Sequence, residues 1–176
     1  MGVLSFNGNK IITTGGGGAV LFRDEVLAAK AKHLATTAKL PHAWEFHHDE
    51  VGYNYRMPNL NAALGCAQLK RLSEFLEVKR RLASDYQNFF ADQKDVQFVG
   101  ARLGTKPNFW LNAVLVKDRP MRDQWLREAN AQGIMMRPVW ELMCDLPMYA
   151  ECTRDGLDVA RALTSRLVNL PSGVPT

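Results

Sequence analysis

The sequence predicts an α/β fold in which a long helix links two domains, one spanning residues 1–75 and the other residues 76–176. Apolar residues recur at helical spacing from Asn59 onward over roughly 30 residues, which is longer than a usual globular helix and suits a connection between domains. Two short apolar segments flank a glycine run before this helix. Alternating strand and helix patterns follow it, as is typical of a small α+β domain.

The N-terminal domain begins with two predicted strands, Val3–Phe6 and Ala19–Phe22, because both are short apolar runs bounded by turn residues. Asp24 is a suitable N-cap for a helix that extends to about Leu34. Residues 39–57 then form a long connection that is rich in aromatic residues and histidines. Loops of this length are usually functional.

The second domain is predicted from the end of the linking helix, which we expect to bend near Ser73. Its apolar segments indicate three strands, and two amphipathic segments indicate helices. The predicted strands are Val96–Val99, Phe109–Val116 and Ile134–Val139, and the predicted helices are Pro120–Ala131 and Leu157–Leu167.

Charge and composition argue against a nucleic-acid partner. The net charge is +4 and the pI is about 9.1, with Lys and Arg scattered along the chain. The one dense basic run, Lys79-Arg80-Arg81, falls within a helical pattern, and we interpret it as a solvated helix face rather than a phosphate patch.

The sequence also argues against a membrane or secreted protein. No apolar stretch is long enough to span a bilayer, and Met1–Leu4 lacks the layout of a signal peptide. The three cysteines are odd in number and do not form a CxxC motif. These features predict a cytoplasmic protein without a membrane partner.

The glycine run Gly15–Gly18 does not belong to a common nucleotide-binding motif. A phosphate-binding P-loop requires the lysine after the glycines, whereas Lys10 precedes them. A dinucleotide fingerprint beginning at Gly15 requires glycine at position 20, which is Val20. Two interpretations stay open: tight packing between two strands, or close approach of the backbone to a cofactor.

The segment Ser5-Phe6-Asn7-Gly8-Asn9-Lys10, followed by glycines, resembles the cofactor-lysine segment of the DegT/DnrJ/StrS family of sugar aminotransferases. Ser5 and Lys10 match the family's serine and its Schiff-base lysine five residues later. The resemblance implies that pyridoxal 5'-phosphate (PLP) is the cofactor, that Lys10 is catalytic and binds it, and that Ser5 contacts its phosphate. Without this context a lone lysine near a turn would be interpreted as a surface charge.

Two further blocks resemble the same family. Gly52–Gly65 resembles its GYNYR and LNAA segment, which implies that Asn54 reaches the cofactor phosphate of the neighbouring subunit in a homodimer with a shared site. Arg137–Trp140 resembles a small-domain region near the sugar substrate, although a packed loop with an exposed arginine explains that block about as well. We expect Arg56 and Arg137 to bind substrate.

The resemblance extends from Gly2 to Pro171, where Arg166–Ser172 is similar to the segment before the family's last helix. It implies the C-terminal part of a fold-type I PLP aminotransferase: the end of a large parallel-sheet domain, a linking helix and a small α+β domain whose last helix is missing. The family's acidic partner of the pyridine nitrogen and its stacking aromatic have no counterpart before Ser5. We therefore expect the chain alone to be inactive.

The function implied is transamination of a 4-keto nucleotide-linked deoxysugar, with L-glutamate as the amino donor, for cell-surface polysaccharide or glycan biosynthesis. The sequences of the motifs are similar to those in the branch of the family that contains the legionaminic-acid and bacillosamine enzymes. The alternatives are a non-catalytic fragment that serves in dimerisation or nucleotide-sugar binding, and an unrelated small α/β binding protein.

A metal site is conceivable in the long connection from residue types alone, because His42, His47 and His48 lie near Asp49 and Glu50. Adjacent His47 and His48 cannot easily face one ion on a regular element. We therefore favour a substrate-cleft or surface loop and predict no metal.

Overall fold

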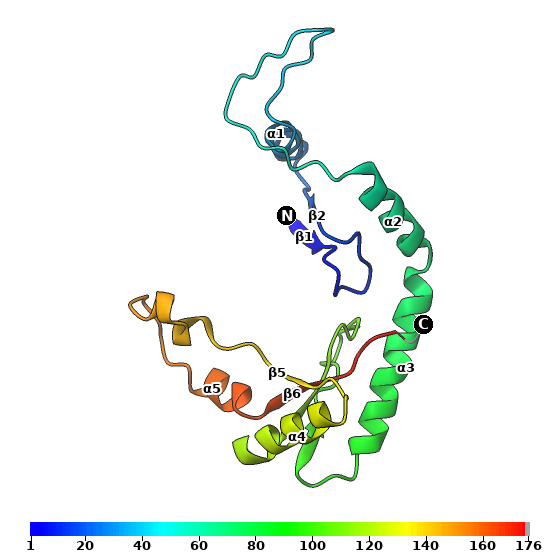
Figure 1. Cartoon of the computed structure of the whole chain (residues 1–176), viewed down its shortest axis with the longest axis vertical. Helices are drawn as coiled ribbons and strands as arrows, with labels where there is room; N and C mark the ends of the chain where they lie inside the picture. The colour runs from blue at the N-terminus through cyan, green and yellow to red at the C-terminus, as the bar shows by residue number, and fades with distance from the viewer. Residues whose placement is uncertain (175–176) are drawn as a thin grey trace. The chain divides into compact units, whose positions relative to one another are not determined.

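The computed structural model describes residues 1–174, and the chain divides into two compact units, Met1–Ser73 and the residues from Glu74 onward (Figure 1). The first unit contains β1 (Gly2–Ser5), β2 (Gly18–Leu21), α1 (Glu25–Ala35) and α2 (Asn59–Lys70). Within residues 1–174, no helix combines the length and the apolar character that crossing a bilayer requires.

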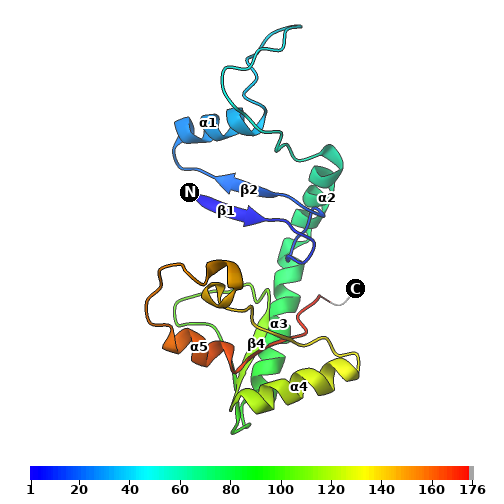
Figure 2. The ribbon, with the colours of Figure 1, turned by 60° about the vertical axis from the view of Figure 1, so that its left-hand side comes forward.

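Strands β1 and β2 form an antiparallel ribbon in which Gly2 pairs with Leu21 and Ser5 with Gly18 (Figure 2). At Gly18 a Cβ atom would lie 2.4 Å from the carbonyl oxygen of Leu4, so any side chain would push the strands apart. The predicted strands are thus present, and the glycine is required where they meet.

Helix α1 begins where the sequence predicts, because Asp24 caps it. The Asp24 Oδ1 accepts hydrogen bonds from the backbone N–H groups of Val26 and Leu27, at 2.8 and 3.1 Å. These are donors that the first turn of a helix otherwise leaves unpaired.

The predicted linking helix is two helices, α2 and α3 (Leu72–Phe90), separated at Arg71. Arg71 has φ −100° and ψ 3°, outside the helical region, and its N–H bonds to the carbonyls of Gln68 and Leu69. The expected bend near Ser73 is therefore a break that lies two residues earlier.

The second unit contains a four-stranded antiparallel sheet in the order β3-β4-β6-β5. Two helices and two short 3-10 turns connect its strands. The elements are β3 (Val96–Phe98), β4 (Asn112–Val116), α4 (Arg119–Ala131), β5 (Arg137–Pro138), α5 (Asp158–Thr164) and β6 (Leu167–Leu170), with 3-10 turns at Met143–Asp145 and Pro147–Tyr149.

Three elements of the second unit differ from the prediction by more than one residue. The helix expected to reach Leu167 ends at Thr164, and the next residues form β6, whose alternating buried residues include Val168. Strand β4 begins at Asn112 because Phe109 has φ +47°, which extended backbone cannot adopt. Strand β5 is confined to two residues at the edge of the sheet, where a proline lacking an N–H donor is tolerated.

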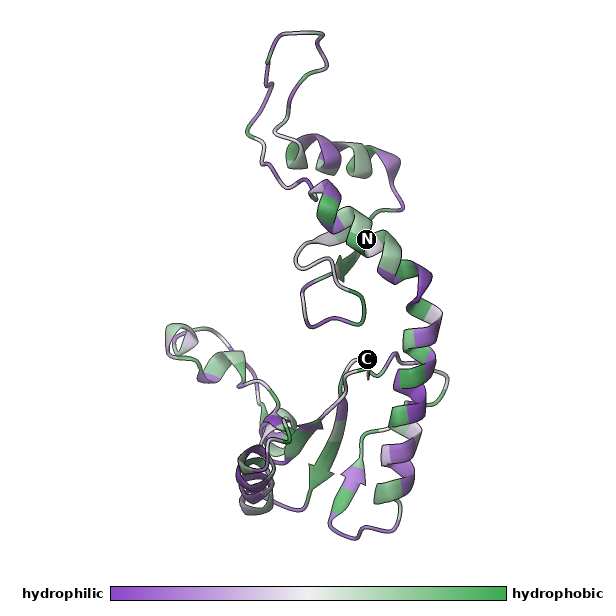
Figure 3. Ribbon diagram, turned by 45° about the vertical axis from the view of Figure 1, so that its right-hand side comes forward, coloured by the Kyte–Doolittle hydropathy of each residue, from purple (hydrophilic) through white to green (hydrophobic). Residues whose placement is uncertain are grey.

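One face of this sheet carries the core. Figure 3 shows hydrophobic colouring along its central strands, and side chains from α3 and α4 pack on them. The buried cluster consists of Phe90, Val96, Val114, Val116, Val168 and Leu170, against which Tyr86, Phe98, Met121, Trp125, Leu126 and Met136 pack.

Lys79 corrects an expectation, because it is 4% exposed rather than part of a solvated helix face. Its Nζ donates a hydrogen bond to the backbone carbonyl of Ser172, and burial lowers the pKa of its ammonium group. Lys79 lies on the same face of α3 as the buried residues Ala83 and Phe90, because residues at i, i+4 and i+11 project from one side of a helix.

Ser172 ties the segment after β6 to β4. Its Oγ accepts a hydrogen bond from the backbone N–H of Asn112 at 2.8 Å and donates one to the Leu170 carbonyl at 2.8 Å. Both Ser172 and Asn112 are buried, so these groups have little access to water as an alternative partner.

We predict that Ser172→Ala lowers the free energy of unfolding by about 1–3 kcal/mol, because it leaves the buried Asn112 N–H without its acceptor. Urea denaturation followed by circular dichroism measures this change. Exposed Ser84 on α3 provides the control, and Ser84→Ala should change stability by no more than about 0.5 kcal/mol. Equal effects of the two substitutions would contradict the role given to Ser172.

Candidate functional site

Lys10 lies in the loop that joins β1 to β2, where it is half-buried and its backbone N–H donates to the Asn7 carbonyl at 3.0 Å. The loop closes on Phe6. The Phe6 N–H donates to the Gly17 carbonyl at 2.9 Å, and its carbonyl accepts from the Thr14 N–H at 3.0 Å. Gly15 and Gly17 have φ of +80° and +108°, so the turn back into β2 uses backbone conformations that favour glycine.

Ser5 is the last residue of β1 and pairs with Gly18, so its hydroxyl lies at the end of the ribbon from which the Lys10 loop departs. Its Oγ accepts a long hydrogen bond, 3.5 Å, from the Asn7 N–H. Because a hydroxyl can donate while it accepts, the proton of exposed Ser5 can be directed at a ligand. The structure thus brings Ser5 and Lys10 to one end of the ribbon.

Asn54 lies on the returning side of an arm formed by residues 37–54. The arm is paired by isolated bridges between Lys39 and His48 and between Thr36 and Asn54. Its base is held at the end of α1, where the Tyr53 N–H donates to the Leu34 carbonyl at 2.7 Å. Asn54 itself is exposed.

Arg56 lines a hollow of about 850 Å³ within the first unit. The walls come from β2, from the small and basic side chains of α1, and from the start of α2. The lining residues include Gly16–Phe22, Ala28, Lys32, Met57 and Asn61, whereas Ser5, Lys10 and Asn54 are not among them. The structure therefore brings exposed Arg56 to the same hollow as the glycines that follow Lys10.

Two histidines of the arm, His42 and His47, lie 3.8 and 2.7 Å from Glu45 Oε2 through their Nε2 atoms, whereas His48 has a different partner. His42 Nδ1 accepts from the Glu45 N–H at 2.9 Å, His47 Nε2 lies 2.7 Å from Glu45 Oε2, and His48 Nδ1 lies 2.7 Å from the Thr37 carbonyl. Within the part of the chain that the structure describes, the group with metal-ligand spacing is His33, Asp49 and Glu50. It includes none of the three histidines considered from the sequence.

His33, which the sequence did not single out, holds the arm to α1. Its Nε2 lies 2.6 Å from Asp49 Oδ1, and the neighbouring Glu50 carboxylate pairs with Lys30. The hydrogen bond from His33 lowers the pKa of the Asp49 carboxyl, with a smaller contribution from the charge of Lys30.

Arg137 lies in β5 of the second unit and is exposed. Its guanidinium donates to Asn130 Oδ1 at 2.6 Å and to the Met136 carbonyl at 3.0 Å, which fixes the side chain against the end of α4. These two contacts leave other N–H donors of the guanidinium for a ligand.

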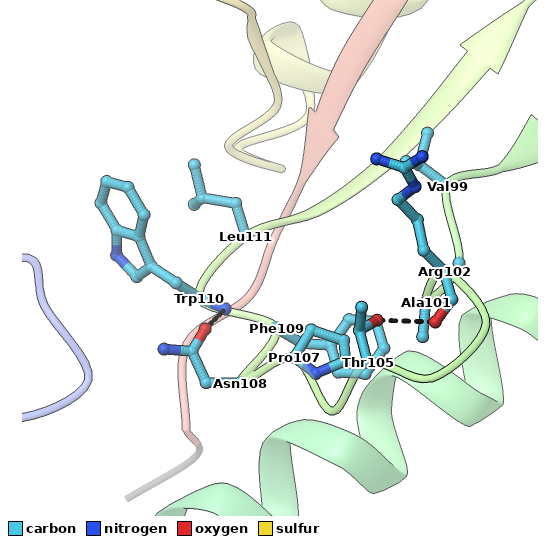
Figure 4. Close-up of a pocket in the computed structure, with 10 residues that line it drawn as sticks. Val99, Ala101, Arg102, Thr105, Pro107, Asn108, Phe109, Trp110 and Leu111 are labelled. Carbon is cyan, nitrogen blue, oxygen red and sulfur yellow. Dashed lines mark hydrogen bonds between the residues drawn. The ribbon is translucent and has the colours of Figure 1, made fainter.

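The second unit has its own hollow of about 400 Å³, formed by the loop before β4 (Figure 4). The loop is braced from within, since the Thr105 hydroxyl donates to the Arg102 carbonyl at 2.7 Å and the Trp110 N–H donates to Asn108 Oδ1 at 3.0 Å. Trp110 also stacks with Trp140, with ring centroids 6.2 Å apart. Trp110 precedes β4, and Trp140 follows β5.

Helix α2 supplies three residues to the Lys10 loop that the sequence analysis gave no role. Gln68 Oε1 accepts from the Thr13 N–H at 2.8 Å, Asn61 Nδ2 donates to the Thr14 carbonyl at 2.5 Å, and Thr14 packs over Gly65. The signal that could have found them is their spacing, because residues at i, i+4 and i+7 share one face of a helix.

Comparisons with known proteins identify related sequences and structures. Residues 1–175 match the profile of the DegT/DnrJ/EryC1/StrS aminotransferase family. The chain is 37% identical over 178 residues to a GDP-perosamine synthase of Caulobacter vibrioides, covering 96% of this chain and 46% of that enzyme.

Two solved structures share the fold. The aminotransferase TlmJ from Streptoalloteichus hindustanus has a TM-score of 0.89 and 26% identity, over 97% of this chain and 46% of its own. Helicobacter pylori PseC, an aminotransferase involved in the biosynthesis of pseudoaminic acid, has a TM-score of 0.89 and 25% identity, over 96% of this chain and 47% of its own. The chain spans about half the length of the relatives it matches.

The arm should loosen in acid. Because His33 lowers the pKa of Asp49 in the folded arm, the carboxylate stabilises the arm above its ordinary pKa of 3.8, and this contribution is lost as the pH falls through the lower folded value. We predict that hydrogen-exchange protection of the Asp49 amide, which bonds to the Ala38 carbonyl at 3.3 Å, decreases in that range.

Asp49→Asn should lower the protection at neutral pH and abolish its change in acid, since an amide does not titrate there. Asp92→Asn, an exposed change beyond the end of α3, should leave the protection of the arm unaltered. If wild type and Asp49→Asn lose protection along the same pH curve, the His33–Asp49 contact does not hold the arm.

Proposed function

This chain belongs to the DegT/DnrJ/EryC1/StrS aminotransferase family, whose enzymes are PLP-dependent, and we propose that Lys10 is the residue to which the cofactor is attached. The observation that carries the proposal is the closed loop between β1 and β2. It presents a half-buried lysine at the end of the ribbon where the Ser5 hydroxyl also lies.

The groups around Lys10 suit PLP. The amine of Lys10 can bond to the cofactor's aldehyde, and the hydroxyl of Ser5 can donate a hydrogen bond to its phosphate. At Gly16, a Cβ atom would meet nothing within 4 Å, so the backbone there borders open space within the hollow lined by Arg56. The planar ring of the cofactor requires open space of this kind beside the loop.

PLP supplies the electron sink that lets an amino group move from one carbon skeleton to another. The protein's own residues then have three tasks. The amine of Lys10 lies close to the substrate carbon that reacts. It takes up a proton there as general base and returns it as general acid. Ser5 and Asn54 bind the phosphate, Asn54 from the neighbouring subunit of a homodimer. The guanidinium groups of Arg56 and Arg137 bind the anionic parts of the substrates.

We further propose that the acceptor is a 4-keto nucleotide-linked deoxysugar and that L-glutamate is the amino donor. The Caulobacter relative is a GDP-perosamine synthase, and PseC is an aminotransferase of pseudoaminic acid biosynthesis, which supports a sugar acceptor. Fork-shaped guanidinium groups such as those of Arg56 and Arg137 match both a nucleotide diphosphate and a glutamate carboxylate. The product would serve cell-surface polysaccharide or glycan synthesis.

Lys10 is tested by covalent labelling. In a full-length protein that contains this chain, we expect borohydride treatment with PLP to place a pyridoxyl group on Lys10, identified by peptide mass spectrometry, and Lys10→Ala to abolish transamination. Lys32→Ala is the control, because Lys32 borders the hollow of the first unit, which Lys10 does not line, and lies on α1. A label on another lysine together with an active Lys10→Ala protein would refute the assignment, and labelling of none would favour a non-catalytic role in dimerisation or sugar binding.

Asn54 is tested by subunit mixing. When full-length Lys10→Ala protein exchanges subunits with full-length Asn54→Ala protein, each heterodimer holds one site with Lys10 and Asn54 both intact. Random exchange should therefore restore about a quarter of wild-type activity from two inactive parents. The measurement is 2-oxoglutarate release from glutamate. No recovery after exchange, confirmed by mass spectrometry, would show that Asn54 does not act across the subunits.

A further inference from the structure

We propose that helix α2 sets the position of the Lys10 loop, and that Asn61, Gly65 and Gln68 are positioning residues for Lys10. The proposal rests on the function proposed for Lys10. It concerns a different set of contacts, those between the backbone that follows the lysine and one face of a helix about 50 residues further along the chain.

The two hydrogen bonds from α2 reach consecutive residues of the loop. Gln68 Oε1 accepts from the Thr13 N–H at 2.8 Å, and Asn61 Nδ2 donates to the carbonyl of Thr14 at 2.5 Å. One side chain thus accepts from the loop and the other donates to it. The ribbon view places α2 beside this loop (Figure 2).

Gly65 lies between these two contacts on the same helix face. A Cβ atom added there would lie 2.8 Å from Thr14 Cγ2, closer than side chains approach one another. Thr14 is only 2% exposed, although the loop is otherwise largely accessible. The glycine therefore lets the threonine methyl settle against the helix backbone, between the two amide side chains.

These contacts fix how α2 lies against the Lys10 loop, and none of the helix's own residues is fully buried. The two hydrogen bonds are directional and the gap at Gly65 fits one methyl group. Turning the helix by one residue would move all three positions away from the loop.

Thr13 and Thr14 connect these contacts with α2 to Phe6, the residue that follows Ser5 at the start of the Lys10 loop. The Thr13 hydroxyl donates to the Phe6 carbonyl at 3.0 Å and accepts from the Gly15 N–H at 2.9 Å. The Thr14 N–H donates to the same Phe6 carbonyl at 3.0 Å. Phe6 follows Ser5 directly, so α2 holds both ends of the segment that contains Lys10.

Gln68 accepts a hydrogen bond from the loop and Asn61 donates one, so replacing each amide by a carboxylate of the same size should have different effects. Gln68 needs only an acceptor, so Gln68→Glu retains the bond to the Thr13 N–H. Asn61 needs a donor, so Asn61→Asp replaces it with a carboxylate that faces the Thr14 carbonyl and repels it. A merely structural requirement for side-chain volume would not distinguish these two substitutions.

The test measures loop order and lysine reactivity separately. We expect Asn61→Asp and Gln68→Ala to lower hydrogen-exchange protection of residues 11–17 roughly tenfold, and Gln68→Glu to retain it. In a full-length protein that contains this chain, the same two disruptive variants should slow borohydride-trapped labelling of Lys10 by PLP and lower kcat for transamination more than they change KM. Lys70→Ala, an exposed change at the end of α2, should alter none of these values.

The two readouts separate this proposal from the proposed function. If Lys10 is labelled and Asn61→Asp leaves both the loop protection and the labelling rate at wild-type values, α2 does not position the loop. Equal losses in Gln68→Glu and Gln68→Ala would also overturn it. If wild-type Lys10 takes no label, the function of Lys10 is wrong, and the exchange measurements alone still decide whether α2 orders the loop.

Discussion

The backbone of Phe6 is the constraint on which the first unit depends. Its N–H closes the loop on Gly17, and its carbonyl accepts from both the Thr14 N–H and the Thr13 hydroxyl. The backbone groups of one residue thus join the end of β1, the segment carrying Lys10 and the glycines that lead into β2. Because two of these three bonds come from Thr13 and Thr14, the shape of the loop depends on the threonines as well as on the glycines.

Helix starts and the local motif were predictable because their causes lie within a few residues. Asp24 caps α1 through its own next turn, and the spacing of Ser5 and Lys10 places both at one end of the ribbon. Strand β6 was not predictable in the same way. The apolar side chains of residues 157–170 first follow a helical period and then the period of two that is typical of a strand. The position of this change becomes clear only in the sheet, where Val168 lies opposite Val114.

The missed parts of the site are long-range contacts. Thr13 and Gln68 are 55 residues apart, and Thr14 and Asn61 are 47 apart, so no local pattern links a loop threonine to a helix amide. His33 was missed for the same reason, since its partner Asp49 lies across the arm. Lys79 shows the converse error: a basic run indicated solvent exposure, yet the helix turns this one member toward the carbonyl of Ser172.

The four glycines show how one run can meet several constraints, which is why the sequence left two interpretations open. Gly18 allows tight strand packing, because its neighbour is the carbonyl of Leu4, and Gly15 and Gly17 have the positive φ values that the turn requires. Gly16 has neither reason, since a Cβ atom there would meet nothing within 4 Å. Three of the glycines are thus explained by the fold itself. At the fourth, Gly16, neither packing nor backbone conformation requires a glycine, and the backbone borders the hollow of the first unit.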